Sequence, residues 1–205
     1  MNPPLDCSRR VALLAVCGAL LPAEASAQAP SASLVFEGQT FERQMALAGS
    51  HLILNGVGLR SVAWLKGFVA GLYLSSPART EAQVLSTSGP KRLRLRMLLD
   101  VPASEFVKAL RKGVARNLGG ADSAIELAAP LDQFEITMGA VGRVRNGDVI
   151  DLDLDPARGT LIVVNGTLRG DPIVGDAFYR ALLRSFIGSQ PYDDKLRIGL
   201  LGPLP

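Results

Sequence analysis

Residues 55–60 (NGVGLR) are followed eight positions later by residues 68–74 (FVAGLYL), and these two stretches predict neighbouring strands. The first strand is loosened by glycine and ends in Arg60, just before a strongly apolar strand. A guanidinium in apolar surroundings is costly unless an anion or a hydrogen-bonding partner meets it. Arg60 is therefore the first candidate for a ligand contact, and the alternative is a structural arginine bonded to carbonyls or to an acidic side chain.

The first 27 residues are typical of a cleaved export signal. A positive start, an apolar run at 11–21 and the small residues 25–27 precede Gln28. Paired arginines near the start leave both the Sec and the twin-arginine route open. We expect a mature protein that begins at Gln28 with a short leader (28–33), is periplasmic or secreted, and has no stable membrane anchor after cleavage.

Composition limits the chemistry of the mature chain. Both cysteines, Cys7 and Cys17, lie in the predicted signal, so no disulfide, thiolate nucleophile or cysteine-based metal site is expected. His51 is the single histidine, so we expect no metal, no cofactor and no catalytic triad. A formal net charge of +3 gives no reason to expect nucleic acid as a partner. The remaining length fits one domain with a single core.

Hydrophobic patterning predicts an α+β domain. Residues 91–99 give the clearest strand, because Leu93, Leu95, Met97 and Leu99 alternate with arginines. Further strands are predicted at 34–36, 52–54, 65–74, 149–154 and 161–164, the last of these ending at an Asn165-Gly166 hairpin turn. Helices are predicted at 100–118 with Asp100 as cap, at 131–138, at 175–186, and at 193–201 with Asp193 as cap. This order indicates a mostly antiparallel sheet covered on one side.

Two charged strand faces invite functional interpretations that we do not favour. Asp151, Asp153 and Asp155 have the spacing of a calcium loop, but Pro156 and Ile162 stand where glycine and glutamate are required. We therefore expect a solvated strand face. The basic face could attract an anionic surface, but without interleaved aromatic residues we again expect a solvated outer face, formed by Lys91, Arg92, Arg94 and Arg96.

Taken in order, several stretches resemble the bacterial chalcone isomerase-like proteins. The similarity covers about residues 34–202, and it is carried by residues 54–60, 68–74, 89–93, 178–183 and 200–202. The resemblance implies an open-faced β-sandwich, in which a large antiparallel sheet packs against a layer of helices with a ligand cleft between them.

The resemblance also implies which residues would act. Plant chalcone isomerases use an arginine, matched by Arg60, to hold developing enolate charge, helped by a threonine, a tyrosine and an asparagine. By spacing, Phe68, Phe106 and Gly113 stand at those three positions, and none of them offers a side-chain hydrogen bond. In the fatty-acid-binding members the same arginine holds a carboxylate, assisted by a tyrosine that also corresponds to Phe68.

We therefore expect a non-catalytic domain that binds a small apolar anion, a fatty acid or a phenolic compound, with Arg60 at the head group. The expected ligand-binding residues are Arg60, Phe68, Leu72, Phe106, Leu110 and Gly113. One alternative is an isomerase or intramolecular lyase acting on a chalcone-like or enone substrate, with Arg60 as its catalytic residue. The other is a structural scaffold whose cleft is filled by its own side chains.

Overall fold

The computed structural model describes residues 32–62, 65–119 and 121–205. In this part of the chain the main feature is a seven-stranded sheet in which every neighbouring pair is antiparallel. In spatial order its strands are β11 (Thr167–Ile173), β10 (Gly159–Val164), β9 (Val149–Asp155), β6 (Lys91–Met97), β5 (Leu65–Leu74), β4 (Ser50–Val62) and β3 (Gln44–Leu47).

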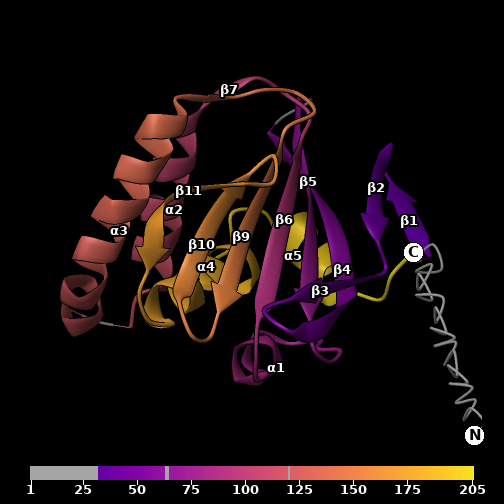
Figure 1. Cartoon of the computed structure of the whole chain (residues 1–205), viewed down its shortest axis with the longest axis horizontal. Helices are drawn as coiled ribbons and strands as arrows, with labels where there is room; N and C mark the ends of the chain where they lie inside the picture. Colours follow the sequence, from indigo (N-terminus) through magenta and orange to yellow (C-terminus); the bar gives the residue numbers. More distant parts are fainter. Residues whose placement is uncertain (1–31, 63–64, 120) are drawn as a thin grey trace, which may run out of the picture. The chain divides into compact units, whose positions relative to one another are not determined.

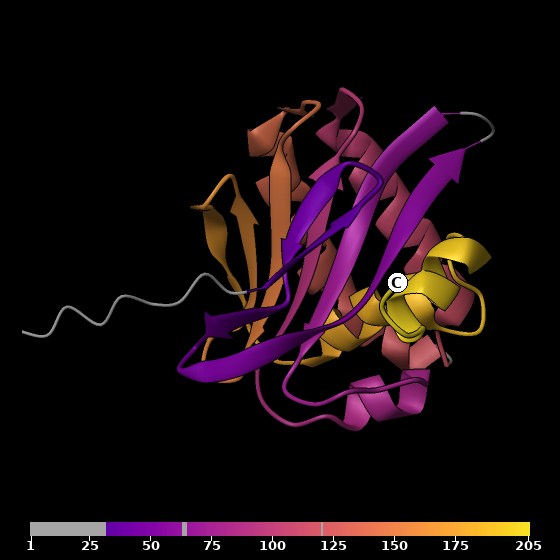
Figure 2. The ribbon, with the colours of Figure 1, turned by 90° about the vertical axis from the view of Figure 1, so that its right-hand side faces the viewer.

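Helices cover one face of this sheet, and a small hairpin lies against the other (Figure 1, Figure 2). The helices are α1 (Glu81–Ser86), α2 (Ala103–Asn117), α3 (Ala121–Val141), α4 (Ala177–Ile187) and α5 (Asp194–Leu201). The hairpin consists of β1 (Ser33–Phe36) and β2 (Gln39–Glu42), and β7 (Val101–Pro102) pairs with β8 (Arg143–Val144). The expected α+β class and antiparallel sheet are confirmed. Within the described residues, none of the helices combines the length and apolarity needed to cross a bilayer.

One apolar layer lies on each side of the sheet, because successive side chains along a strand point to opposite faces. On β6, Leu93, Leu95 and Met97 are buried beneath the helices, as the alternation predicted, but the strand ends at Met97, before the predicted end at Leu99. On β5, Ala70, Leu72 and Leu74 join this main core, while Val69 and Tyr73 join the smaller core beneath the hairpin. The central strand is therefore apolar on both faces, as predicted.

The glycines of β4 allow a helix to approach the sheet closely. A Cβ atom on Gly56 would lie 2.4 Å from the backbone oxygen of Leu200, and one on Gly58 would lie 2.7 Å from that of Leu196. Asn55 strengthens this contact by donating its side-chain amide to the oxygen of Leu200 at 2.8 Å. The glycines therefore make room for α5, and the pairing of β4 with β5 shifts register between Leu54 and Gly56.

Two predicted helices differ in extent from the structure by three residues or more. The predicted cap Asp100 does not cap α2, which begins at Ala103; its carboxylate instead accepts a hydrogen bond from the backbone nitrogen of Asn146 at 2.9 Å. Helix α3 is longer than the predicted 131–138 and runs through Pro130. The residues before Pro130 include several alanines, which have high helix propensity, so the helix forms on both sides of the proline.

Candidate functional site

A row of side chains across three strands forms the floor of a cleft between the sheet and the helices. Arg60 on β4 lies directly opposite Phe68 on β5, and Phe68 lies opposite Met97 on β6. Residues opposite one another in an antiparallel pair project from the same face, so these three side chains point toward the helices. Helix α2 covers them with Phe106 and Ala109, which line the same cleft.

The cleft has two parts, which we call the inner pocket and the outer pocket. The inner pocket has a volume of about 70 Å³, and the outer pocket about 210 Å³. Both are lined by Arg60, Phe68, Phe106 and Ala109. The inner pocket is completed by Leu95, Leu110, Phe134, Leu152, Leu182, Phe186 and Tyr192. The outer pocket is completed by Leu65, Gly67, Met97, Leu99, Val101 and Glu105.

Aromatic rings occupy much of the inner pocket. The ring of Phe68 lies 6.4 Å from that of Phe106 in a stacked arrangement and 6.5 Å from that of Phe186. Phe186 in turn meets Tyr192 edge to face at 5.0 Å. These contacts are within the range at which aromatic pairs stabilise one another. The inner pocket is therefore small because the protein fills it with its own rings, whereas the outer pocket remains open and apolar.

Arg60 is held by an acidic partner at the edge of this cleft. Its Nη1 atom donates to the backbone oxygen of Ser61 at 2.8 Å and to Asp193 Oδ2 at 3.1 Å. The other oxygen, Asp193 Oδ1, accepts from the backbone nitrogens of Lys195 and Leu196, which confirms Asp193 as the N-cap of α5. Burial opposes the charge of Asp193, but these hydrogen bonds and Arg60 outweigh it and lower the pKa of Asp193. Among the described residues, nothing bonds to Arg60 Nε or Nη2.

The two interpretations of Arg60 therefore describe different atoms of one side chain. The acidic partner expected of a structural arginine is present at Nη1, and the same Arg60 side chain lines an apolar cleft. Carboxylates bind arginine through two parallel N–H groups, and Nε with Nη2 forms such a pair. This pair of N–H groups is distinct from Nη1, the atom that bonds to Asp193.

The structure brings together four of the six residues expected to bind a ligand. The inner pocket is lined by Arg60, Phe68, Phe106 and Leu110. Leu72 is fully buried in the main core, and Gly113 lies against Ser185 and Tyr192, so neither lines this pocket. Tyr192 lines the inner pocket and was missed. The available signal was its position immediately before the predicted cap Asp193, at the entry to a helix.

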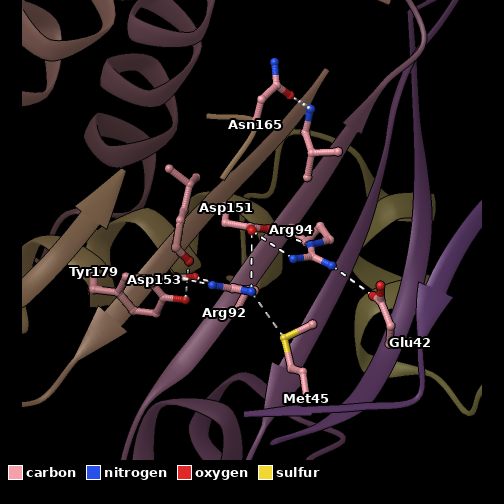
Figure 3. A network of polar contacts seen from close by, with 10 residues as sticks. Glu42, Met45, Arg92, Arg94, Asp151, Asp153, Asn165 and Tyr179 are labelled. Carbon is pink, nitrogen blue, oxygen red and sulfur yellow. Dashed lines mark hydrogen bonds and ion pairs between the residues drawn. The ribbon is translucent and has the colours of Figure 1, made fainter. Parts of the chain in front are cut away.

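The two charged strand faces are not solvated, contrary to our expectation. Arg92 bonds to both oxygens of Asp153 at 2.6 Å, and Arg94 bonds to both oxygens of Asp151 at 2.7 and 2.9 Å and also to Glu42 at 2.9 Å (Figure 3). Asp151 and Asp153 are only 5% and 1% exposed. The reason is register, because β6 lies beside β9 with each of these arginines directly opposite its aspartate. This network holds the sheet together.

The described residues show neither a metal-binding cluster nor a second apolar site at the hollow between α2, α3 and α4. In the described residues, no group of three or more histidine, cysteine, aspartate or glutamate side chains is arranged to hold a metal ion. A hollow of about 350 Å³ lies between α2, α3 and α4, but its lining mixes Glu126 and Asp176 with Arg180 and Arg184. Arg180 lies 3.9 Å from Asp176, and Arg184 pairs with Glu81 at 3.1 Å. Because this hollow is polar and of mixed charge, we place the candidate site at the apolar cleft beside Arg60.

Comparisons with known proteins agree with this architecture. A family model described as chalcone isomerase-like matches residues 33–202. No match is found among curated proteins. The crystal structure of the Arabidopsis thaliana fatty-acid binding protein AtFAP1 is similar, with a TM-score of 0.59 and 18% sequence identity, covering 83% of this chain and 96% of that chain. At this level of identity, the likeness to AtFAP1 concerns the fold.

Proposed function

The chain belongs to the chalcone isomerase-like family, and from this premise we propose that it binds a small apolar carboxylate, such as a fatty acid, with Arg60 at the head group. The observation that carries the proposal is the composition of the inner pocket. Among the described residues that line it, Arg60 is the only charged side chain. A structurally similar protein is named a fatty-acid binding protein, which supports the same class of ligand.

The two pockets suggest how such a ligand would lie. Its carboxylate would accept hydrogen bonds from Arg60 Nε and Nη2, in the bidentate geometry that arginine favours. Its chain would extend through the outer pocket over Met97, Leu99 and Val101. The outer pocket, at about 210 Å³, is smaller than the roughly 300–1,000 Å³ typical of sites for small molecules. We therefore propose a short or medium chain in preference to a long one.

A filled cleft is the second candidate, because the packing of the aromatic rings favours it directly. Phe68, Phe106 and Phe186 occupy space that a ligand would otherwise use. If they are fixed in these positions, the domain is a scaffold and binds nothing at Arg60. The isomerase alternative lacks a comparable observation, since Phe68 and Phe106 offer only rings where an enolate would need hydrogen-bond donors.

Calorimetric titration of the delipidated protein with octanoate, dodecanoate and hexadecanoate tests the proposal. We expect saturable binding that is stronger for the two shorter acids. Arg60→Ala should weaken this binding by about 10- to 150-fold, the loss expected for a hydrogen-bonded charge pair. The matched control is Arg184→Ala, which removes an ion pair of equal length, 3.1 Å to Glu81, outside the cleft.

The outcomes separate the two candidates. Weak binding by Arg60→Ala alone, with wild-type affinity in Arg184→Ala, supports the proposed site. Absence of binding by the wild-type protein to all three acids supports the filled scaffold. Equal affinity of the wild-type protein and Arg60→Ala would place any bound acid elsewhere and refute the proposal.

A further inference from the structure

Tyr192 is the second polar side chain of the inner pocket. It lies in the connection between α4 and α5 and lines the inner pocket together with Arg60. All the other lining residues carry apolar side chains, so Arg60 and Tyr192 are the two described lining residues with polar side-chain atoms. A pocket with an apolar wall and a few convergent polar groups is the usual form of a specific binding site.

The position of Tyr192 is fixed from several directions. Its backbone nitrogen donates to the oxygen of Ser185 at 2.9 Å. Its ring packs on Phe186 at an interplanar angle of 86°. The next residue, Asp193, caps α5 and bonds to Arg60. The same dipeptide therefore places the Tyr192 ring in the wall of the inner pocket and gives Arg60 its acidic partner, so both side chains are held before any ligand arrives.

The glycine at position 113 makes room for this ring. A Cβ atom on Gly113 would lie 2.7 Å from Tyr192 Cε1 and 2.7 Å from Ser185 Cβ. Real Cβ atoms do not approach other carbon atoms so closely, so any side chain at this position would push one of the two neighbours away. Gly113 does not itself line the pocket, but it allows Tyr192 to do so.

The protonation state of the phenol suits it to donate to an anion. Burial raises the pKa of Tyr192, while a hydrogen bond with Ser185 and the charge of Arg60 act in the opposite direction. The hydroxyl is therefore protonated at neutral pH and has a proton to donate. A hydrogen bond from a neutral hydroxyl to a carboxylate is short and charge-assisted.

We infer that the Tyr192 hydroxyl is the second hydrogen-bond donor to the carboxylate that Arg60 holds, and that Gly113 is needed to position it. This inference rests on the proposed function, because it concerns the head group of the same ligand. Arg60 would hold the carboxylate through Nε and Nη2, and Tyr192 would bind it from the α4–α5 side. The site would then select for a carboxylate through two donors anchored by adjacent residues, 192 and 193.

Titration of Tyr192→Phe with octanoate and dodecanoate tests this role. Loss of one hydrogen bond to a charged acceptor should weaken the binding of both acids by about 10- to 100-fold. The ratio of the two affinities should stay as in the wild-type protein, because the contacts with the chain remain. The matched control is Tyr73→Phe, since Tyr73 is fully buried on the other face of β5 and its hydroxyl has no partner among the described residues.

A second variant, Gly113→Ala, tests the position of the same hydroxyl indirectly. Gly113→Ala should displace the Tyr192 ring and weaken dodecanoate binding in the wild-type background. In the Tyr192→Phe background the same change should cost little more, because no hydroxyl is left to displace. If the losses of dodecanoate affinity in the two single variants add fully in the double variant, Gly113 acts independently of the phenol, and its role in positioning Tyr192 is overturned.

The outcomes distinguish this inference from the proposed function. If the wild-type protein binds dodecanoate and Arg60→Ala weakens that binding, while Tyr192→Phe equals the wild-type protein, the role of Tyr192 is overturned and the proposed function stands. A changed affinity ratio in Tyr192→Phe would indicate a reshaped pocket and would also count against the inference. If the wild-type protein binds no acid, the proposed function fails and this inference fails with it.

Discussion

The Arg60–Asp193 pair offers a quantitative test of whether Arg60 serves the fold or the cleft. We consider Arg60→Ala first. The two side chains are 27% and 16% exposed, so their ion pair lies between the surface and the buried case. Exposed pairs contribute up to about 1 kcal/mol, and breaking a fully buried pair costs about 3–5 kcal/mol.

Removal of Arg60 does not leave Asp193 without partners. Asp193 Oδ1 still accepts hydrogen bonds from the backbone nitrogens of Lys195 and Leu196, so the carboxylate remains satisfied. We therefore expect Arg60→Ala to lower the free energy of unfolding by about 1 to 2 kcal/mol, well below the cost of stranding a buried charge. For a domain of this size the melting temperature should fall by about 2–4 °C per kcal/mol.

Removal of Asp193 costs more, because the cap is lost together with the ion pair. The loss of an N-cap alone costs about 1 kcal/mol, so Asp193→Ala should lower the free energy of unfolding by about 2 to 3 kcal/mol. Once Asp193 is absent, Arg60→Ala should add almost nothing, and the double-mutant cycle should return a coupling of about 1 to 2 kcal/mol.

Urea unfolding at one pH of the wild-type protein, the two single variants and the double variant measures every free energy in this cycle. The slope of unfolding against urea should be the same in all four, which would show that the same transition is compared. A loss of 3 kcal/mol or more in Arg60→Ala alone would refute the reasoning and make Arg60 a primarily structural residue. A coupling near zero would refute the stabilising role of the ion pair, because the 3.1 Å contact between Arg60 and Asp193 would then contribute nothing to the free energy of unfolding.

Three other predictions follow from the structure, and a fourth concerns the predicted export signal, which lies outside the described residues. The pKa of Asp193 is lowered on folding, so this carboxylate stabilises the folded protein above its unfolded pKa of about 3.9, and the stabilisation is lost as the pH falls below that value. The urea midpoints of the wild-type protein and Asp193→Ala should therefore differ at pH 7 and converge as the pH falls. Arg92→Ala should strand Asp153 and cost about 3–5 kcal/mol in urea unfolding, whereas Arg92→Met combined with Asp153→Leu should recover most of that loss. Chalcone cyclisation followed by absorbance should be no faster with the protein than in buffer, since Phe68 and Phe106 offer no hydrogen bond to a developing enolate. Saturable turnover would revive the isomerase alternative. Export should leave Gln28 as the first residue, and N-terminal sequencing that finds Met1 on the exported protein would contradict the proposed signal.

Local patterns were sufficient to predict most of the elements that support the cleft. The alternation of Leu93, Leu95 and Met97 predicted β6, and the Asn165-Gly166 turn and the Asp193 cap are both present. Each of these signals lies within a few residues of the structure that it predicts. They report the preferences of the backbone and which side chains share a face, and both are local properties.

Contacts between distant segments were not predictable in the same way. The arginines of β6 and the aspartates of β9 each resemble a solvated face when considered alone, because alternation does not say what a face meets. Only the register that puts Arg92 opposite Asp153 shows that they are partners. The contact of Gly56 with α5 was unpredictable for the same reason, since Leu200, which it accommodates, lies far along the chain. Tyr192 was missed because a single tyrosine in a loop forms no periodic pattern.

The arrangement around Arg60 favours equilibrium binding over catalysis on electrostatic grounds. Asp193 gives Arg60 a fixed counter-charge, so the guanidinium is oriented and partly neutralised before any ligand enters. A ligand that already carries its charge can use Nε and Nη2 at once and gain from donors that need no reorganisation. Catalysis would require donors directed at an oxygen whose charge develops only in the transition state. Phe68 and Phe106 stand beside Arg60 and provide none, which leaves the Tyr192 hydroxyl as the one further donor among the described lining residues. Arg60 and Tyr192 are both in place before a ligand enters, so they favour a ligand whose charge is already present.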